Sequence, residues 1–303
     1  MKTITTFFLF SLGGIVMFSC HSESFNEEAW KQGVESWHQD RIDNLTQDDS
    51  WLSLAGLYWL EEGHNSFGSD PDNDIVFEYE FIPNHLGVFI LEGNEVRVEL
   101  EPASGVKIDG VLSDKATVYL DNHQEGEIEL SLEHLSWYII ERSGHFAVRL
   151  KDHKHPNLLE FSGIERFPVS TEWKVEADFI QFDSPLPMTI PDYSGIPREE
   201  NILGVLEFDL QGERHRLYPV ADNLEDRFFV IFADETNGQT TYNAGRFVYT
   251  DPPDENNRVI IDFNRSYNPP CVFSPYATCP LPPPENRLSA YVYAGELNYE
   301  PGY

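Results

Sequence analysis

The chain has 303 residues, of which 20 are lysine or arginine and 52 are aspartate or glutamate, so its formal net charge is −32. A field of that sign repels nucleic-acid phosphates and anionic lipid headgroups, which argues against nucleic-acid partners and polybasic membrane attachment. Hydrophobic residues make up 41% of the chain, enough for packed cores, and the length corresponds to about two domains.

Residues 1–19 are predicted to be a signal peptide. Lys2 supplies a positive charge, residues 4–18 form an apolar run, and Cys20 follows a small residue. The cysteine at this edge resembles a bacterial lipoprotein signal, which implies lipidation of Cys20 in an exported protein. We therefore expect a cell-envelope protein that meets a membrane only through its lipid anchor. The alternative is an ordinary signal peptide with an incidental cysteine.

Residues 20–49 are expected to form a tether and a short helix. Ser24 and Glu27 have the spacing of a helix capping box. A helical repeat follows and predicts that one face of the helix lies against the folded body. This face consists of Trp30, Val34, Trp37, Arg41 and Leu45.

From residue 50 onward the apolar residues follow the two-residue period of strands. Alternating runs flank turn residues at Gly93, at Asp109-Gly110 and at Ser143-Gly144, which predicts hairpins. The fold class is therefore expected to be all-β, with a β-sandwich over residues 50–150 and a second antiparallel β unit over residues 151–303. Residues 288–294 are expected to form the last strand of the second unit.

The first unit weakly resembles a forkhead-associated domain over residues 58–150. The resemblance rests on residues 63–70 and 73–77, with Asn84-His85 and Asp109-Gly110 near two of the family's turns. It implies a β-sandwich of that shape. Ser69 follows Gly68 where the family has its phosphate-binding arginine, so the resemblance does not imply recognition of phosphothreonine.

The C-terminal half contains two unusual sequence strings, DFNRSYNPPC at residues 262–271 and YATCPLPPPENRL at residues 276–288. The part of the chain that carries them, residues 262–288, is called the signature segment below. These strings closely resemble a widespread bacterial family classed only as a domain of unknown function. Residues 51–60 and 161–163 match other stretches of the same family. The resemblance implies kinship from about residue 30 to residue 299, but no activity.

Cys271 and Cys279 are the two cysteines that remain if Cys20 carries lipid. An even pair in an oxidising compartment favours a disulfide. Two free buried thiols or half of a metal site are the alternatives. No metal or other cofactor is predicted.

Scarce arginines share the signature segments with acidic and amide side chains. The candidate ligand-binding residues are Arg246, Arg265, Arg287, Asp234, Asp262, Asn264, Asn268 and Tyr267. Since an arginine fork suits carboxylate or phosphate, they predict binding of a small polar or anionic ligand, or of an envelope partner. The alternative is an internal network of ion pairs that fixes long loops.

Two further functions stay open. One is a hydrolase that uses Asp234 or Asp262 with a histidine that the sequence does not identify, so no catalytic residue is assigned and it is left open whether the chain is an enzyme. The other is a purely structural envelope scaffold.

Overall fold

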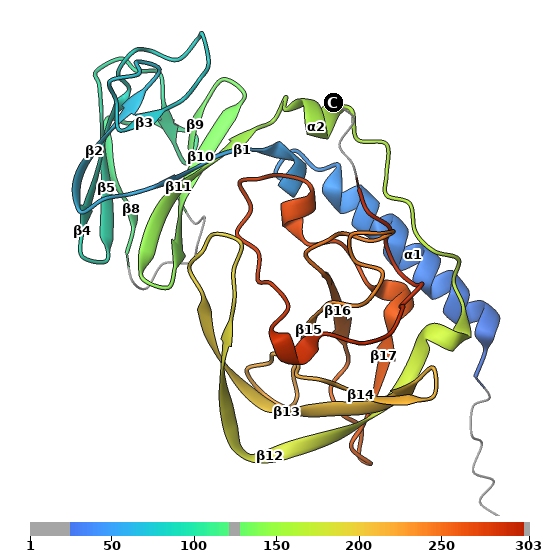
Figure 1. Ribbon diagram of the computed structural model, residues 1–303. Coiled ribbons are helices and arrows are strands. Elements are labelled where there is room, and N and C mark those ends of the chain that lie inside the picture. The colour runs from blue at the N-terminus through green and yellow to red at the C-terminus, as the bar shows by residue number, and fades with distance from the viewer. Residues whose placement is uncertain (1–24, 121–127, 300–303) are drawn as a thin grey trace, which may run out of the picture.

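The computed structural model describes residues 25–120 and 128–299, and it confirms the all-β fold class (Figure 1). The predicted signal peptide and Cys20 lie outside the described residues. Within the described part, none of the helices combines the length and the apolar character needed to cross a membrane.

The first unit is a sandwich of two sheets. A five-stranded sheet has the order β3-β2-β4-β5-β8, and a six-stranded sheet has the order β1-β11-β10-β9-β6-β7. Every pairing is antiparallel except that of β2 with β3. The strands are β1 (Leu54–Trp59), β2 (Gly63–Gly68), β3 (Ile75–Val76), β4 (Gly87–Glu92), β5 (Glu95–Leu100), β6 (Lys107–Ile108), β7 (Val111–Leu112), β8 (Lys115–Tyr119), β9 (Leu130–Leu132), β10 (Leu135–Arg142) and β11 (His145–Asp152).

The three predicted hairpins are confirmed. Asp109 and Ser143 adopt φ of 48° and 49°, and the glycine after each also has positive φ, as tight turns with right-handed strand twist require. The core between the two sheets contains Trp137, which is fully buried against Phe67 and Phe77. A boundary at residue 151 falls within the last residues of β11.

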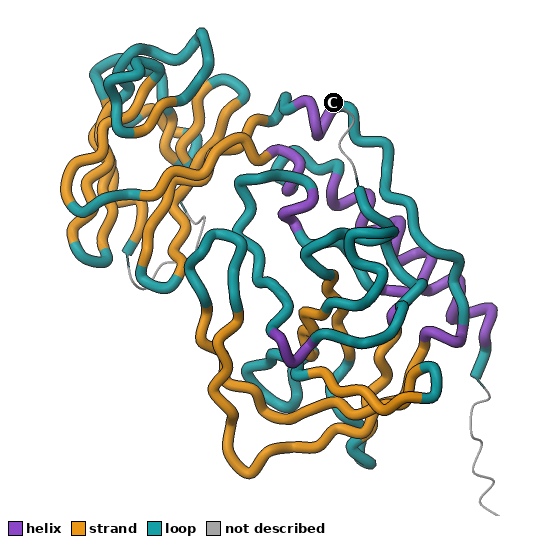
Figure 2. Tube along the Cα trace, viewed as in Figure 1, coloured by secondary structure: helices purple, strands orange, loops and turns teal. Residues whose placement is uncertain are grey.

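The second unit contains fewer strands and more irregular chain (Figure 2). A four-stranded antiparallel sheet has the order β14-β13-β12-β17, and β15 pairs with β16 as a separate ribbon. Its strands are β12 (Lys174–Ile190), β13 (Arg198–Leu210), β14 (Glu213–Leu217), β15 (Phe228–Phe232), β16 (Arg246–Thr250) and β17 (Arg258–Asp262). Short helical turns also occur in this unit: α2 (Pro156–Leu159), η2 (Thr171–Trp173), η3 (Phe263–Arg265), η4 (Pro270–Val272) and η5 (Pro284–Asn286). Another short turn, η1 (Trp51–Ser53), lies between the N-terminal helix and β1.

The strand predicted at residues 288–294 is wrong, although its alternation is real. Leu288, Ala290, Val292 and Ala294 are all buried, as every second residue of a strand would be. The segment belongs to no strand in the described chain, and its backbone contacts residues 233–235 only through two hydrogen bonds, from the Leu288 amide to the Ala233 carbonyl and from the Glu235 amide to the Ala290 carbonyl. The carbonyls of Val292 and Ala294 accept hydrogen bonds from the Arg246 side chain instead.

The predicted helix is α1 (Glu27–Leu45), and it lies along the second unit (Figure 1). Its N-cap is Asn26, whose side chain accepts a hydrogen bond from the Ala29 amide, rather than Ser24. Trp30 Nε1 donates to Asp262 Oδ2 at 2.9 Å, and Arg41 donates to the buried carboxylate of Glu296. The helix is therefore tied to the C-terminal segments by polar as well as apolar contacts.

Gly33 in the middle of α1 gives a test of this packing. A Cβ added there would meet Arg265 Nη2 at 3.6 Å, an ordinary contact, so Gly33→Ala should stabilise the protein by about 0.5–1 kcal/mol through helix propensity. Urea unfolding measures the change. The contrasting variant is Gly68→Ala, whose Cβ would lie 2.3 Å from the Asn84 carbonyl oxygen and should destabilise. A loss of stability in Gly33→Ala would contradict the described fit of α1.

Candidate functional site

Arg246 and Asp234 form an ion pair in the interior of the second unit. Arg246 Nη2 donates to Asp234 Oδ2 at 2.8 Å, and both side chains are completely buried. The guanidinium also donates to the carbonyls of Val292, at 3.0 Å, and Ala294. Burial lowers the pKa of Arg246, while the Asp234 carboxylate opposes that shift. With no exposed surface, this pair matches the internal network and offers a ligand no access.

The other two arginines lie elsewhere. Arg265 Nε lies 3.7 Å from Asp262 Oδ2, which also accepts the hydrogen bond from Trp30 of α1. Arg287 is exposed after η5. The three predicted arginines therefore do not form one pocket floor.

The predicted asparagines support irregular backbone. Asn264 Oδ1 accepts from the Ser170 amide, and its Nδ2 donates to the Ser170 carbonyl, both at 2.9 Å. Asn268 Nδ2 donates to the Leu297 carbonyl at 2.7 Å. These amides replace ladder hydrogen bonds that loop segments lack. Asn268 differs in one respect, since its buried Oδ1 has no hydrogen-bond partner within the described residues.

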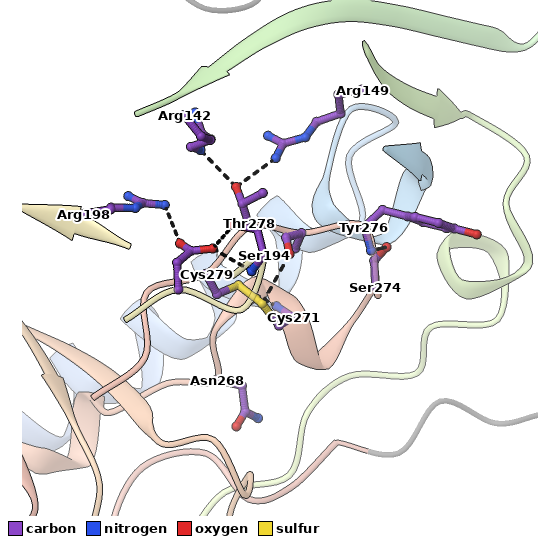
Figure 3. Close-up of a disulfide and its surroundings, with 12 residues drawn as sticks. Arg142, Arg149, Ser194, Arg198, Asn268, Cys271, Ser274, Tyr276, Thr278 and Cys279 are labelled. Atoms are coloured by element: carbon purple, nitrogen blue, oxygen red, sulfur yellow. Dashed lines mark hydrogen bonds and ion pairs between the residues drawn. A yellow bond between two sulfur atoms is a disulfide. The ribbon is translucent and has the colours of Figure 1, made fainter. Parts of the chain in front are cut away.

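Cys271 and Cys279 are joined by a disulfide with an S–S distance of 2.15 Å (Figure 3). Thr278 Oγ1, next to it in the chain, accepts hydrogen bonds from Arg142 Nε at 3.0 Å and Arg149 Nη2 at 3.2 Å. Both arginines belong to the first unit. The disulfide loop therefore contacts both units and fixes the signature segment between them.

A cleft of about 670 Å³ lies where α1, the first unit and the signature segment meet, and it is called the central cleft below. Its lining comes from α1 and η1, from β10 and β11, from β15 and β16, and from residues 267–273. Eight aromatic side chains contribute to its wall: Trp37, Trp51, Tyr138, Phe229, Phe247, Tyr249, Tyr267 and Phe273. Of the predicted site residues, Tyr267 and Asn268 line it, and the other six do not.

Stacked aromatic and cationic groups cross the central cleft. The Arg41 guanidinium lies 4.5 Å from the centre of the Tyr267 ring, and Tyr267 lies parallel to Tyr249 with ring centres 6.4 Å apart. The Arg227 guanidinium lies 5.0 Å from the centre of the Tyr249 ring. Burial raises the pKa of Tyr267, so its hydroxyl stays protonated at neutral pH.

Charged groups of both signs line the same cleft. Lys151 reaches it from β11 with its Nζ 5.2 Å from the Tyr138 ring, and Asp40 and Asp49 enter from α1 and the segment that follows it. Sequence reasoning assigned no site role to these residues or to Arg41. Arg41 does lie on the predicted inward face of the helix. An arginine among the apolar residues of that face is the sequence feature that could have indicated a site.

The described contacts place no histidine beside the two acids that the hydrolase alternative requires. Asp234 and Asp262 have no histidine among their described partners. A histidine–carboxylate contact does occur elsewhere: His134 Nδ1 lies 2.7 Å from Asp152 Oδ1, and Tyr79 donates to the same carboxylate. This contact ties the turn before β10 to the end of β11. In the described part of the chain, no group of three potential ligands is arranged to hold a metal ion.

Comparisons with known proteins identify related sequences. The profile of a family described as "Protein of unknown function (DUF1684)" matches residues 159–297. An uncharacterized protein of Haloarcula marismortui, solved by NMR, is 31% identical over 46% of this chain and 77% of its own, with a TM-score of 0.39. None of the curated proteins matches the chain.

Two further solved structures are similar to parts of this chain. One is an FHA domain studied for phosphothreonine-dependent interactions, 12% identical over 31% of this chain and 92% of its own. The other is Mycobacterium tuberculosis EmbR with a low-affinity phosphopeptide, 14% identical over 43% of this chain and 33% of its own. Both have TM-scores of 0.22, and neither adds to the function.

The buried pair predicts a sharp asymmetry between arginines. Arg246→Met strands the Asp234 carboxylate in the interior and should cost about 3–5 kcal/mol of unfolding free energy, measured by urea denaturation. Arg287→Met, at an exposed position, is the control and should change stability by less than about 0.5 kcal/mol. Equal effects of the two substitutions would contradict a structural role specific to Arg246.

Proposed function

Since the chain belongs to the DUF1684 family, whose function is unknown, we propose from the central cleft that it binds a small organic molecule with a flat, apolar body. This proposal keeps the predicted binding of a small ligand. It moves the site from the three arginines to a cleft that shares only Tyr267 and Asn268 with the predicted set.

The observation that carries the proposal is a hollow walled by aromatic rings. Its volume of about 670 Å³ lies in the usual range for small-molecule sites, which are mostly apolar with a few polar groups. Trp51 and Tyr249 stay 38% and 41% exposed at its wall. A ligand that covers these rings removes from water the apolar surface that the folded chain leaves exposed, and this burial stabilises the complex.

The same lining favours binding over catalysis. The side chains around the central cleft include no histidine and no cysteine, and Ser50 supplies their one aliphatic hydroxyl. A hydroxyl without a neighbouring base is a poor nucleophile at neutral pH. The lining therefore supports a binding protein rather than a hydrolase.

We also propose that the protein acts in the cell envelope, anchored through lipid on Cys20. The support is the sequence of residues 1–20, since these residues lie outside the described part. A disulfide between Cys271 and Cys279 fits an oxidising compartment.

Ligand binding is tested with N-phenyl-1-naphthylamine, a neutral aromatic probe that fluoresces in apolar sites. Wild-type protein should bind the probe, and Tyr249→Ala should weaken binding about 2- to 12-fold, the equivalent of one lost aromatic contact. Tyr291→Ala is a matched control, because Tyr291 is also 41% exposed and stacked on a tyrosine but lies outside the cleft. Absence of saturable binding, or equal weakening in both variants, would refute the proposed site.

Lipid anchoring is tested by Cys20→Ala in a bacterial host. Wild-type protein should incorporate labelled palmitate and sediment with membranes, while the variant should do neither, because the thiol that carries the acyl chains is gone. Cys271→Ser is the control and should keep the label. Label retained by the Cys20→Ala protein would show that Cys20 is incidental.

A further inference from the structure

The charged groups of the central cleft do not pair with one another. Lys151, Asp40 and Asp49 form no ion pair within the described residues, and the carboxylate partner of Arg41 is Glu296, which is buried and does not line the cleft. Lys151 and the two carboxylates thus line one hollow without pairing with one another, while the charge of Arg41 is balanced by Glu296. Lys151, Asp40 and Asp49 are free to interact with charges on a ligand.

Arg41 is held with part of its fork unused. Its Nε and Nη2 both donate to the Glu296 carboxylate, and Nη2 also donates to the Asn268 carbonyl at 2.9 Å. Within the described residues, Nη1 has no hydrogen-bond partner. The ring of Tyr267 fixes the guanidinium plane from one side. A positioned N–H pair of this kind is suited to a carboxylate.

Asp40 and Asp49 supply the complementary charge. Both residues are exposed and line the central cleft, and neither forms an ion pair within the described residues. An ammonium group of a ligand can pair with these carboxylates.

From these unpaired groups, and on the basis of the proposed function, we propose that the ligand is a zwitterion: a short peptide with aromatic side chains and free ends. Its carboxylate meets Lys151 and the Nη1 group of Arg41, and its ammonium group meets the carboxylates of Asp40 and Asp49. An anion alone would leave the acceptors unpaired and would approach against the field of a chain with net charge −32. A cation alone would leave Lys151 unpaired.

The volume of the central cleft favours a peptide over a single amino acid. About 670 Å³ is in the middle of the range for sites that enclose drug-sized ligands. Aromatic rings on several sides of the cleft provide surfaces for more than one aromatic side chain.

Four matched dipeptides test the proposal by displacement of N-phenyl-1-naphthylamine. They are Phe-Phe with free ends, its N-acetyl form, its C-terminal amide, and the form with both caps. Each cap removes one charge and leaves both rings, so we expect the free dipeptide to displace the probe best, with each cap weakening displacement about tenfold or more.

Variants assign each charge to its group. Lys151→Gln should weaken only the dipeptides with a free carboxylate, and Asp49→Asn only those with a free amine. Lys154→Gln, an exposed lysine three residues further on and outside the cleft, is the control and should change none of them.

The outcomes separate the two proposals. If the neutral probe does not bind, the proposed function fails. If the probe binds but the doubly capped dipeptide displaces it as well as the free one, the zwitterion proposal is overturned and the binding cleft stands. The zwitterion proposal is also overturned if one cap has no effect, or if none of the four dipeptides displaces the probe.

Discussion

The buried pair of Arg246 and Asp234 organises the second unit. The guanidinium binds the Asp234 carboxylate and the carbonyls of Val292 and Ala294, so one side chain holds the end of a segment that forms no strand. Strand alternation then places the next residues on the opposite face. Phe247 and Tyr249 line the central cleft, while Arg246 faces the interior. The interaction that fixes the loops thus also positions two walls of the candidate site.

The central cleft belongs to neither unit alone. Tyr138 and Lys151 come from the first unit, Trp37 and Arg41 from α1, and Tyr267 from the signature segment. Contacts of Arg142 and Arg149 with Thr278 hold these parts together beside the disulfide (Figure 3). A ligand in the cleft would therefore contact all three parts, and its affinity would depend on how firmly they are held.

Local chemistry explains what could be predicted from sequence. The hairpin turns follow from Asp109-Gly110 and Ser143-Gly144, because positive φ at these positions is a property of two adjacent residues. The inward face of α1 follows from its apolar repeat. The false strand at residues 288–294 shows the limit of this reasoning. Its alternation reports burial correctly, but the carbonyls of Val292 and Ala294 are bound by a side chain more than 40 residues away in sequence.

The candidate site could not be predicted in the same way. Arg246, Arg265 and Arg287 look alike in sequence, yet one is buried, one is half-buried and one is exposed. Which arginine meets a carboxylate in the interior depends on contacts between distant segments.

The position of α1 has a mechanical consequence for an anchored protein. Six residues separate Cys20 from the first residue of the helix, and the chain between the two reaches at most about 25 Å. Trp37 and Arg41 lie roughly 15–21 Å further along the helix axis. A lipid on Cys20 would thus keep the folded protein close to the bilayer. The distance between the bilayer and the cleft mouth would then depend on the tilt of one helix.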